Sequence, residues 1–169
     1  VLERCASDLF FRTAPFVMFD EGIWKMWYVG GGSWTELGGK MVPVYRVKYL
    51  ESEDGLNWRG DGTVCIDFEN ESEHGFGRPF VIKRNGSYEM FYSIRTKTKG
   101  YRLGYARSEN GRSWTRSDEE VGMDVSPNGW DSHAVCYSSL VRVRERTYMF
   151  YNGNNFGETG VGYALLQGG

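Results

Sequence analysis

Three segments of this chain repeat one pattern of aromatic, β-branched and turn-forming residues. The middle copy runs from Gly77-Arg78-Pro79 to Trp114, and Asn85-Gly86 and Asn110-Gly111 separate its apolar runs. Asn and Gly readily adopt the positive φ angles that tight turns between antiparallel strands require. Short apolar runs broken by Asn-Gly are therefore typical of a β-meander. The sequence predicts three such meanders.

The repeat spacing indicates what the meanders build. An aromatic motif occurs once in each copy, as Lys-Met-Trp-Tyr at 25–28, Glu-Met-Phe-Tyr at 89–92 and Tyr-Met-Phe-Tyr at 148–151. Pro15 and Pro79 lie 64 residues apart, and Trp58 and Trp114 lie 56 residues apart. A unit of this length with four short strands fits one blade of a β-propeller that carries loop insertions.

We therefore predict one all-β domain over residues 1–169, a partial β-propeller of three four-stranded antiparallel blades. The blades cover about residues 12–68, 77–120 and 134–166, and no sustained 3.6-residue apolar period predicts a helix of note. Residues 30–42 are expected to form a long glycine-rich loop that carries Trp34.

The last copy holds three strand-like runs where the others hold four. Its fourth strand is supplied either by residues 1–11 or by another chain. Three blades also leave two flanks of the fan uncovered, and uncovered strand edges and faces invite pairing. A homodimer, or a partner chain that covers the open blade edges, is therefore expected.

Composition excludes several classes of partner. The net charge of −2 argues against nucleic acid. No apolar run approaches the roughly 20 residues that span a bilayer, so no membrane partner is expected.

The three widely spaced cysteines are typical of reduced thiols in a cytoplasmic protein. No leader peptide is recognised. The sequence begins at Val1 and not at a methionine, so the question of whether residues precede Val1 is left open. No metal or cofactor is expected, because the two histidines lack metal-ligand spacing.

Two turns carry a resemblance to a known group of enzymes. They read Ser-Glu-Asp-Gly-Leu-Asn-Trp at 52–58 and Ser-Glu-Asn-Gly-Arg-Ser-Trp at 108–114. Both resemble the Ser-x-Asp-Gly-x-x-Trp turn of five-bladed propeller glycosidases, which include glycoside hydrolase families 43 and 32 and an uncharacterised bacterial branch. Residues 77–79, 101–106, 129–132 and 148–154 are similar to the C-terminal three blades of that branch. The Asp-box of sialidases is one residue longer, which makes it the weaker match.

The resemblance implies a carbohydrate-active propeller segment that binds or processes a saccharide. Family members place three carboxylates around the central funnel, namely an Asp base or nucleophile, an assisting Asp and a Glu acid. The first two have no counterpart in this chain, so catalysis by the chain alone stays open. The alternatives are a non-catalytic carbohydrate-binding module, or a structural unit that assembles through its open blade edges.

Residues that precede the innermost strand of each blade are expected to face a ligand. Glycoside hydrolysis needs two carboxyl groups about 5–10 Å apart, and Glu73 and Asp131 are the candidates. His133 follows Asp131 by two residues and is a third candidate for acid–base catalysis. The alternatives are that Glu73 is solvated or pairs with Arg78, and that His133 is a hydrogen-bonded strut.

Side chains that recognise sugars are arginines, amides and aromatic rings, because they bind hydroxyl groups or stack on sugar rings. The predicted substrate-binding residues are Arg78, Arg95, Trp34, Tyr45, Tyr137 and Asn154. Phe156 is a further candidate for stacking. The alternatives are that Arg78 bridges two blades, that Arg95 points to solvent, and that Asn154 only shapes a turn.

Overall fold

The computed structural model describes residues 2–166 and shows an all-β chain whose strands form three antiparallel groups. Blade one contains β1 (Phe11–Asp20), β2 (Ile23–Leu37), β3 (Lys40–Ser52) and β4 (Thr63–Ile66). Blade two contains β5 (Glu73–Arg84), β6 (Ser87–Thr96), β7 (Arg102–Ser108) and β8 (Thr115–Arg116). Blade three contains β9 (Cys136–Val143), β10 (Arg146–Asn152) and β11 (Val161–Leu166). The remaining elements are two 3-10 turns, Ala6–Asp8 and Asp118–Val121, and the short α1 (Asn154–Gly157).

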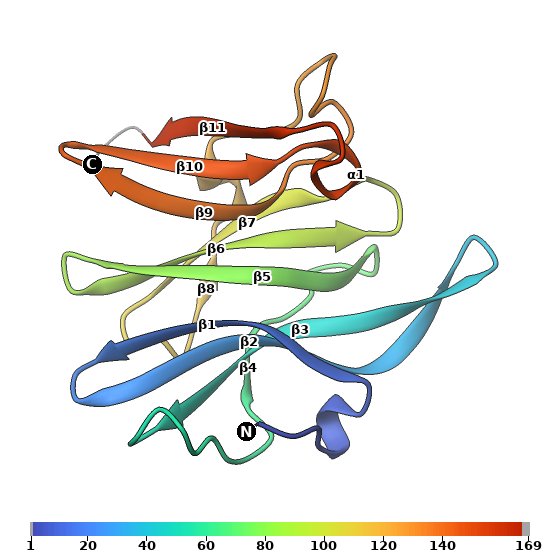
Figure 1. Cartoon of the computed structure of the whole chain (residues 1–169). Helices are drawn as coiled ribbons and strands as arrows, with labels where there is room; N and C mark the ends of the chain where they lie inside the picture. The colour runs from blue at the N-terminus through green and yellow to red at the C-terminus, as the bar shows by residue number, and fades with distance from the viewer. Residues whose placement is uncertain (1, 167–169) are drawn as a thin grey trace.

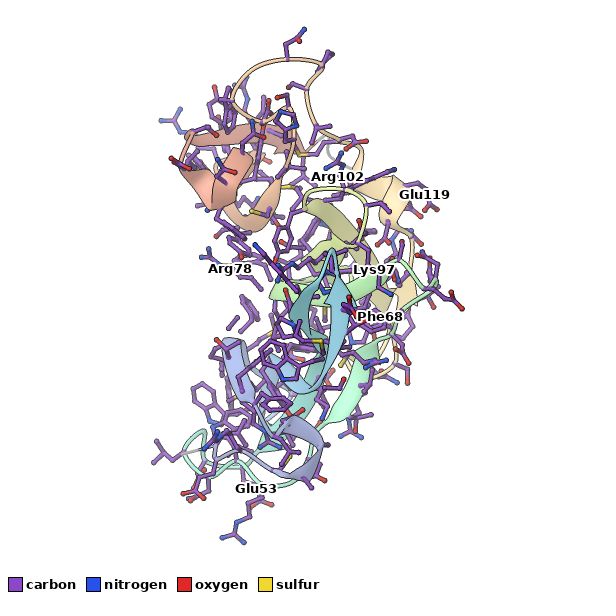
Figure 2. All side chains as sticks on the ribbon, turned by 90° about the vertical axis from the view of Figure 1, so that its right-hand side faces the viewer. Glu53, Phe68, Arg78, Lys97, Arg102 and Glu119 are labelled. Atoms are coloured by element: carbon purple, nitrogen blue, oxygen red, sulfur yellow. The ribbon has the colours of Figure 1, made fainter. Side chains whose placement is uncertain are left out.

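The blades are stacked in an open fan (Figure 1). The first strand of each blade, β1, β5 or β9, lies toward the viewer, and all three run from right to left. The side view shows a crescent whose hollow side carries the label of Arg78 (Figure 2). A parallel pairing of Tyr45 with Gly75 joins β3 to β5 across the first two blades. The predicted partial propeller is confirmed.

Aromatic side chains of the repeated motif fill the spaces between the blades. Trp27 and Tyr92 lie in the core between blades one and two. Phe91 faces the other way and packs with Met149 and Tyr151 between blades two and three. This division follows from strand geometry, because successive side chains point to opposite faces of a blade. Trp27 is fully buried.

The two Ser-x-(Asp/Asn)-Gly-x-x-Trp turns form matching hydrogen-bond networks. In the first, Asp54 Oδ1 accepts bonds from the backbone N–H groups of Leu56 and Asn57, at 2.9 and 2.8 Å. Trp58 Nε1 donates to the carbonyl of Gly55 at 3.0 Å. In the second, Asn110 takes the place of Asp54, and Trp114 Nε1 donates to the carbonyl of Gly111 at 2.9 Å. Trp27 Nε1 also donates to the Gly111 carbonyl, so this turn of blade two is tied to blade one.

The innermost strands share one irregularity. Ala14, Arg78 and Tyr137 have positive φ angles of 47°, 44° and 58°. In β1 and β5 the pairing register skips at these residues, between Thr13 and Phe16 and between Gly77 and Phe80. Bulges of this kind redirect side chains, and left-handed backbone at residues other than glycine is strained. The repeat therefore places one redirected side chain from each blade on the inner strands of the fan.

Residues 30–42 do not form the predicted loop. β2 and β3 continue through them as a paired hairpin, in which Trp34 lies opposite Pro43. The turn comes later, at Gly38 and Gly39, whose φ angles are 57° and 76°. Three consecutive glycines do not stop a strand when β-branched residues follow and a turn is available beyond them. The hairpin projects to the right of the fan in Figure 1.

The N-terminal segment does not supply the fourth strand of blade three. Asp8 is fully buried against blade one, where its carboxylate pairs with Arg12 at 2.9 Å and with Lys48 at 2.7 Å. The backbone N–H of Phe10 donates to Gly31 of β2. Charges buried in this way are held by their partners, so residues 2–10 belong to blade one. Blade three has three strands within residues 2–166.

The cysteines do not form disulfides, as Cys5, Cys65 and Cys136 are all free thiols. No helix within residues 2–166 has the length and apolar character required to span a bilayer. The cytoplasmic location stays a prediction.

Both ends of the fan expose apolar faces. On blade three, Phe150, Val161, Tyr163 and Leu165 point away from blade two and are exposed. On blade one, Val17 and Phe19 point outward, while their neighbours Phe16 and Met18 enter the core. Apolar faces of this kind mark interaction surfaces. We propose that in a solution of this chain alone the blade-three face packs on the blade-one face of a second copy, closing the fan around a two-fold axis.

This proposal predicts the mass of the chain in solution. Light scattering after size exclusion should give a dimer whose fraction grows with concentration. Tyr163→Lys should lower that fraction, because it places a charge in the apolar contact. Met41→Lys is the matched control, since Met41 is 60% exposed on the projecting hairpin. A monomer at every concentration would contradict the proposal.

Candidate functional site

Side chains from all three blades meet at one edge of the fan, where β3 pairs with β5 and where β9 begins. We call them the aromatic–arginine cluster, defined as Tyr45, Arg95, Tyr101, Tyr137 and Phe156. The hydroxyl groups of Tyr45 and Tyr101 lie 2.9 Å apart, and the Arg95 guanidinium lies 5.9 Å from the centre of the Tyr101 ring. The Tyr101 ring lies 5.7 Å from the rings of both Tyr137 and Phe156. The rings of Tyr137 and Phe156 are nearly parallel, at 21°.

Glycines make room for this cluster. A Cβ atom at Gly75 would lie 2.4 Å from Cζ of Tyr45, so only glycine permits the tyrosine ring to rest on the start of β5. The Tyr137 ring lies over Gly77, where a Cβ would be 3.6 Å from its Cε1. The bulge in β9 aims Tyr137 across the gap between blades, and its N–H donates to Ser93 Oγ at 2.8 Å.

Strand periodicity explains why Arg95 joins the cluster. Ser93 and Arg95 alternate along β6 and therefore share one face. Ser93 contacts Tyr137 of blade three, so Arg95 is directed to the same gap. Burial lowers the pKa of Arg95, but the interaction with Tyr45 and the nearby phenol groups together outweigh burial and leave the pKa raised. Arg95 therefore carries a full positive charge beside the rings.

Only some side chains of the cluster are accessible to a ligand. Tyr45 and Tyr101 are buried and support the other residues. Tyr137 and Arg95 are partly exposed, and Phe156 is 57% exposed. A ligand at this edge would therefore meet two aromatic rings and one guanidinium group.

Arg78 lies next to this surface. It follows Gly77, on which the Tyr137 ring rests, and its side chain is exposed on the hollow side of the crescent (Figure 2). Burial raises the pKa of the Cys136 thiol to about 11, against the opposing positive charge of Arg78. The charge of Arg78 thus acts on Cys136, the residue that precedes Tyr137.

Two buried polar atoms near the cluster lack a hydrogen-bond partner within residues 2–166, namely His74 Nε2 and Ser138 Oγ. His74 precedes Gly75, and Ser138 follows Tyr137. Burial lowers the pKa of His74, and its Nδ1 lies 3.2 Å from the Pro43 carbonyl, so a neutral ring has its Nε2 lone pair free. Unsatisfied buried polar atoms are uncommon in folded proteins and call for an explanation. Both are adjacent in sequence to residues of the cluster or the glycine beneath it.

Glu73 serves a different interaction. Its carboxylate forms a two-point ion pair with Arg116, at 2.9 and 2.7 Å, and not with Arg78. Burial raises the pKa of Glu73, but hydrogen bonds from Arg116 and from the Glu69 N–H more than offset this and hold it below its usual value. A carboxyl group held ionised in this way is unsuited to donating a proton to a leaving group at neutral pH.

The other two predicted catalytic residues lie in the loop before β9. Asp131 is buried and accepts a hydrogen bond from Tyr151 at 3.0 Å. His133 is exposed, and its backbone N–H donates to Asn154 Oδ1 at 2.7 Å. No hydrogen bond or ion pair between described residues joins the side chains of Glu73, Asp131 and His133. Their catalytic role stays a prediction. The Glu73 carboxylate has Arg116 as a partner in blade two, and the Asp131 carboxylate has Tyr151 as a partner in blade three.

Two predicted substrate-binding residues have structural contacts of their own. Asn154 is buried, accepts bonds from the N–H groups of His133 and Ala134, and donates to the Gly129 carbonyl. It therefore fixes the loop before β9. Trp34 lies on the projecting hairpin, where its ring packs edge-on against Phe10 at 5.4 Å. No contact between described residues links Trp34 to the aromatic–arginine cluster.

Of the predicted binding residues, the structure thus brings together Tyr45, Arg95 and Tyr137, with Arg78 beside them. Nothing in the sequence marks Tyr101 as a site residue except its place after a polar linker at the start of a strand. No group of three or more potential metal-ligating side chains occurs within residues 2–166.

No protein-family model matches the chain. The uncharacterized protein Rv1502 of Mycobacterium tuberculosis is 34% identical over 160 residues, which cover 95% of this chain and 52% of that protein. The chain therefore spans about half the length of this curated relative.

Solved structures of glycoside hydrolases are similar in fold. A family 117 enzyme from the marine bacterium Zobellia galactanivorans has a TM-score of 0.72 at 16% identity, over 97% of this chain and 54% of its own. A thermostable family-43 enzyme has a TM-score of 0.66 at 20% identity, over 94% of this chain and 55% of its own.

A family 32 β-fructofuranosidase of Bombyx mori has a TM-score of 0.68 at 16% identity, over 89% of this chain and 33% of its own. The predicted resemblance to family 43 and family 32 glycoside hydrolases is thus confirmed at the level of the fold.

The Glu73–Arg116 pair leads to a prediction about stability. A carboxyl whose pKa is lowered by folding stabilises the fold above its unfolded pKa and loses that contribution as the pH falls through its folded pKa. Glu73→Gln should therefore lower the free energy of unfolding by about 1–3 kcal/mol at pH 7, and by less at pH 3.

Urea unfolding at several pH values measures this difference. Glu71→Gln is the control, because Glu71 is exposed in the same loop. Equal stability of the Glu73 variant and the wild type at pH 7 would exclude the structural role and return Glu73 to the catalytic candidates.

Proposed function

We propose that this chain binds a saccharide at the aromatic–arginine cluster, and that it does so without hydrolysing it on its own. The observation that carries the proposal is the meeting of Tyr137, Phe156 and Arg95 at one accessible edge of the fan. Aromatic faces pack against the apolar faces of sugar rings, and guanidinium groups donate hydrogen bonds to oxygen atoms.

Two further observations support the proposal. The edge collects side chains from three blades, and sites in propellers are built where the blades converge. His74 and Ser138, whose buried Nε2 and Oγ atoms lack hydrogen-bond partners within residues 2–166, are the chain neighbours of Gly75 and Tyr137, and such unsatisfied atoms call for a partner. The shared fold with glycoside hydrolases of several families is in agreement with a carbohydrate ligand.

Hydrolysis by this chain alone has less support. Glycoside hydrolysis requires one carboxyl group that holds a proton and a second that attacks or activates water. Glu73 is held ionised by Arg116, and the Asp131 carboxylate is engaged by Tyr151. Processing of the saccharide would then need carboxylates from outside this chain.

The test is binding of an oligosaccharide panel, both neutral and acidic, measured by calorimetry. Phe156→Ala should weaken binding about tenfold through loss of stacking, and Tyr137→Ala should weaken it further. Val64→Ala is the control, because Val64 on β4 is 41% exposed and belongs neither to the cluster nor to the residues named for the proposed dimer contact.

Trp34→Ala tests the alternative site on the hairpin and should leave binding unchanged. Binding that falls with Trp34→Ala and survives Phe156→Ala would move the site to the hairpin. Absence of binding to the whole panel would overturn the proposed function.

A further inference from the structure

We propose that the saccharide bound here carries an acidic group, such as the carboxylate of a uronic acid, and that Arg78 and Arg95 bind that group. This inference rests on the proposed function and names the class of saccharide. It is based on the two arginines at the cluster and on the ion pairs that other charged side chains of the chain form.

Arg78 and Arg95 have no acidic partner among the described residues. Neither forms an ion pair, and Arg78 makes no side-chain hydrogen bond, with any residue in 2–166. Other Arg and Lys side chains near the core do form ion pairs with carboxylates. Arg116 binds Glu73 and Asp118, and Lys48 binds Asp8.

Both arginines belong to strand positions next to the Tyr137 ring. Arg95 lies on the face of β6 that also carries Ser93, the partner of the Tyr137 N–H. Arg78 follows Gly77, which the Tyr137 ring covers. A sugar ring stacked on Tyr137 would therefore lie near Arg95, and the exposed side chain of Arg78 begins beside the same ring. Planar guanidinium groups match the two oxygens of a carboxylate and bind them with charge-assisted hydrogen bonds.

The backbone at Arg78 supports a ligand-directed role. Its φ angle of 44° is strained for a residue with a side chain, and such strain gathers at functional sites. The equivalent position is Ala14 in blade one and Tyr137 in blade three. The bulge therefore presents a small residue, an arginine and an aromatic ring from successive blades. Only blade two presents a charge at this position, beside the second arginine of the same blade.

Matched ligands test this inference. The probes are uronic-acid oligosaccharides, the same oligosaccharides with each carboxyl converted to its methyl ester, and sulfated neutral oligosaccharides. The esters keep the size and stacking surface but remove the charge. The uronic-acid probes should bind at least tenfold more tightly than their esters, and that preference should shrink as salt increases. Tighter binding of the sulfated probes than of the uronic acids would replace the carboxylate with a sulfate as the acidic group.

Substitutions test whether the two arginines cause the tighter binding of the uronic-acid probes. Arg78→Gln and Arg95→Gln should each weaken binding of the acids more than binding of the esters, and so reduce the preference for acids. Glutamine keeps a Cβ and so leaves the backbone preference at position 78 as it was. Arg59→Gln is the control, because Arg59 is exposed in a turn between β3 and β4.

The outcomes separate the two proposals. Equal binding of acids and esters would overturn the acidic-ligand inference and keep the proposed function. A preference that persists in Arg78→Gln, Arg95→Gln and the double variant would overturn the role of the two arginines. Failure of every probe to bind would overturn both.

Discussion

The packing of the Tyr45 ring against Gly75 is the contact on which the arrangement of the site depends. It lies where β3 and β5 pair across the first two blades, and a Cβ at Gly75 would reach 2.4 Å from the ring. The Tyr45 hydroxyl then meets that of Tyr101, and Tyr101 supports Tyr137 and Phe156. One close approach of a ring to backbone therefore joins blade one to blade two and places the aromatic surface between blades two and three.

Some charged side chains of this chain form buried ion pairs, and others are exposed without an acidic partner among the described residues. Buried carboxylates bind cations from elsewhere in the same blade, as Asp8 does with Lys48 and Glu73 with Arg116. Pairs of this kind are costly to break, because the remaining partner stays buried and unpaired. The carboxylates most attractive for catalysis thus have structural partners within their own blades. The two arginines near Tyr137 are left for a ligand, and the site differs from a two-carboxylate hydrolytic centre for this reason.

Much of the fold was predictable, because it depends on local pattern. The repeated motif at 25–28, 89–92 and 148–151 and the Asn-Gly turns indicate the strands, and their spacing indicates the blades. The hairpin that carries Trp34 was not predictable, because a run of glycines indicates a loop unless the pairing partner is known. The site was predictable in part. Residues on inner strands, such as Tyr137, follow from the repeat, whereas the meeting of Tyr101 with Tyr45 depends on packing between blades. The partner of Glu73 was also hidden, since Arg116 lies 43 residues away in the chain.

Hydrogen–deuterium exchange with and without a uronic-acid oligosaccharide tests the central claim most directly, because it locates a bound ligand without any substitution. The account predicts slower exchange in peptides that cover residues 93–101, 136–138 and 154–157, with little change in the hairpin at 31–44 and in the loop at 69–72. Slower exchange confined to the hairpin or to that loop, at a ligand concentration that saturates binding, would contradict it.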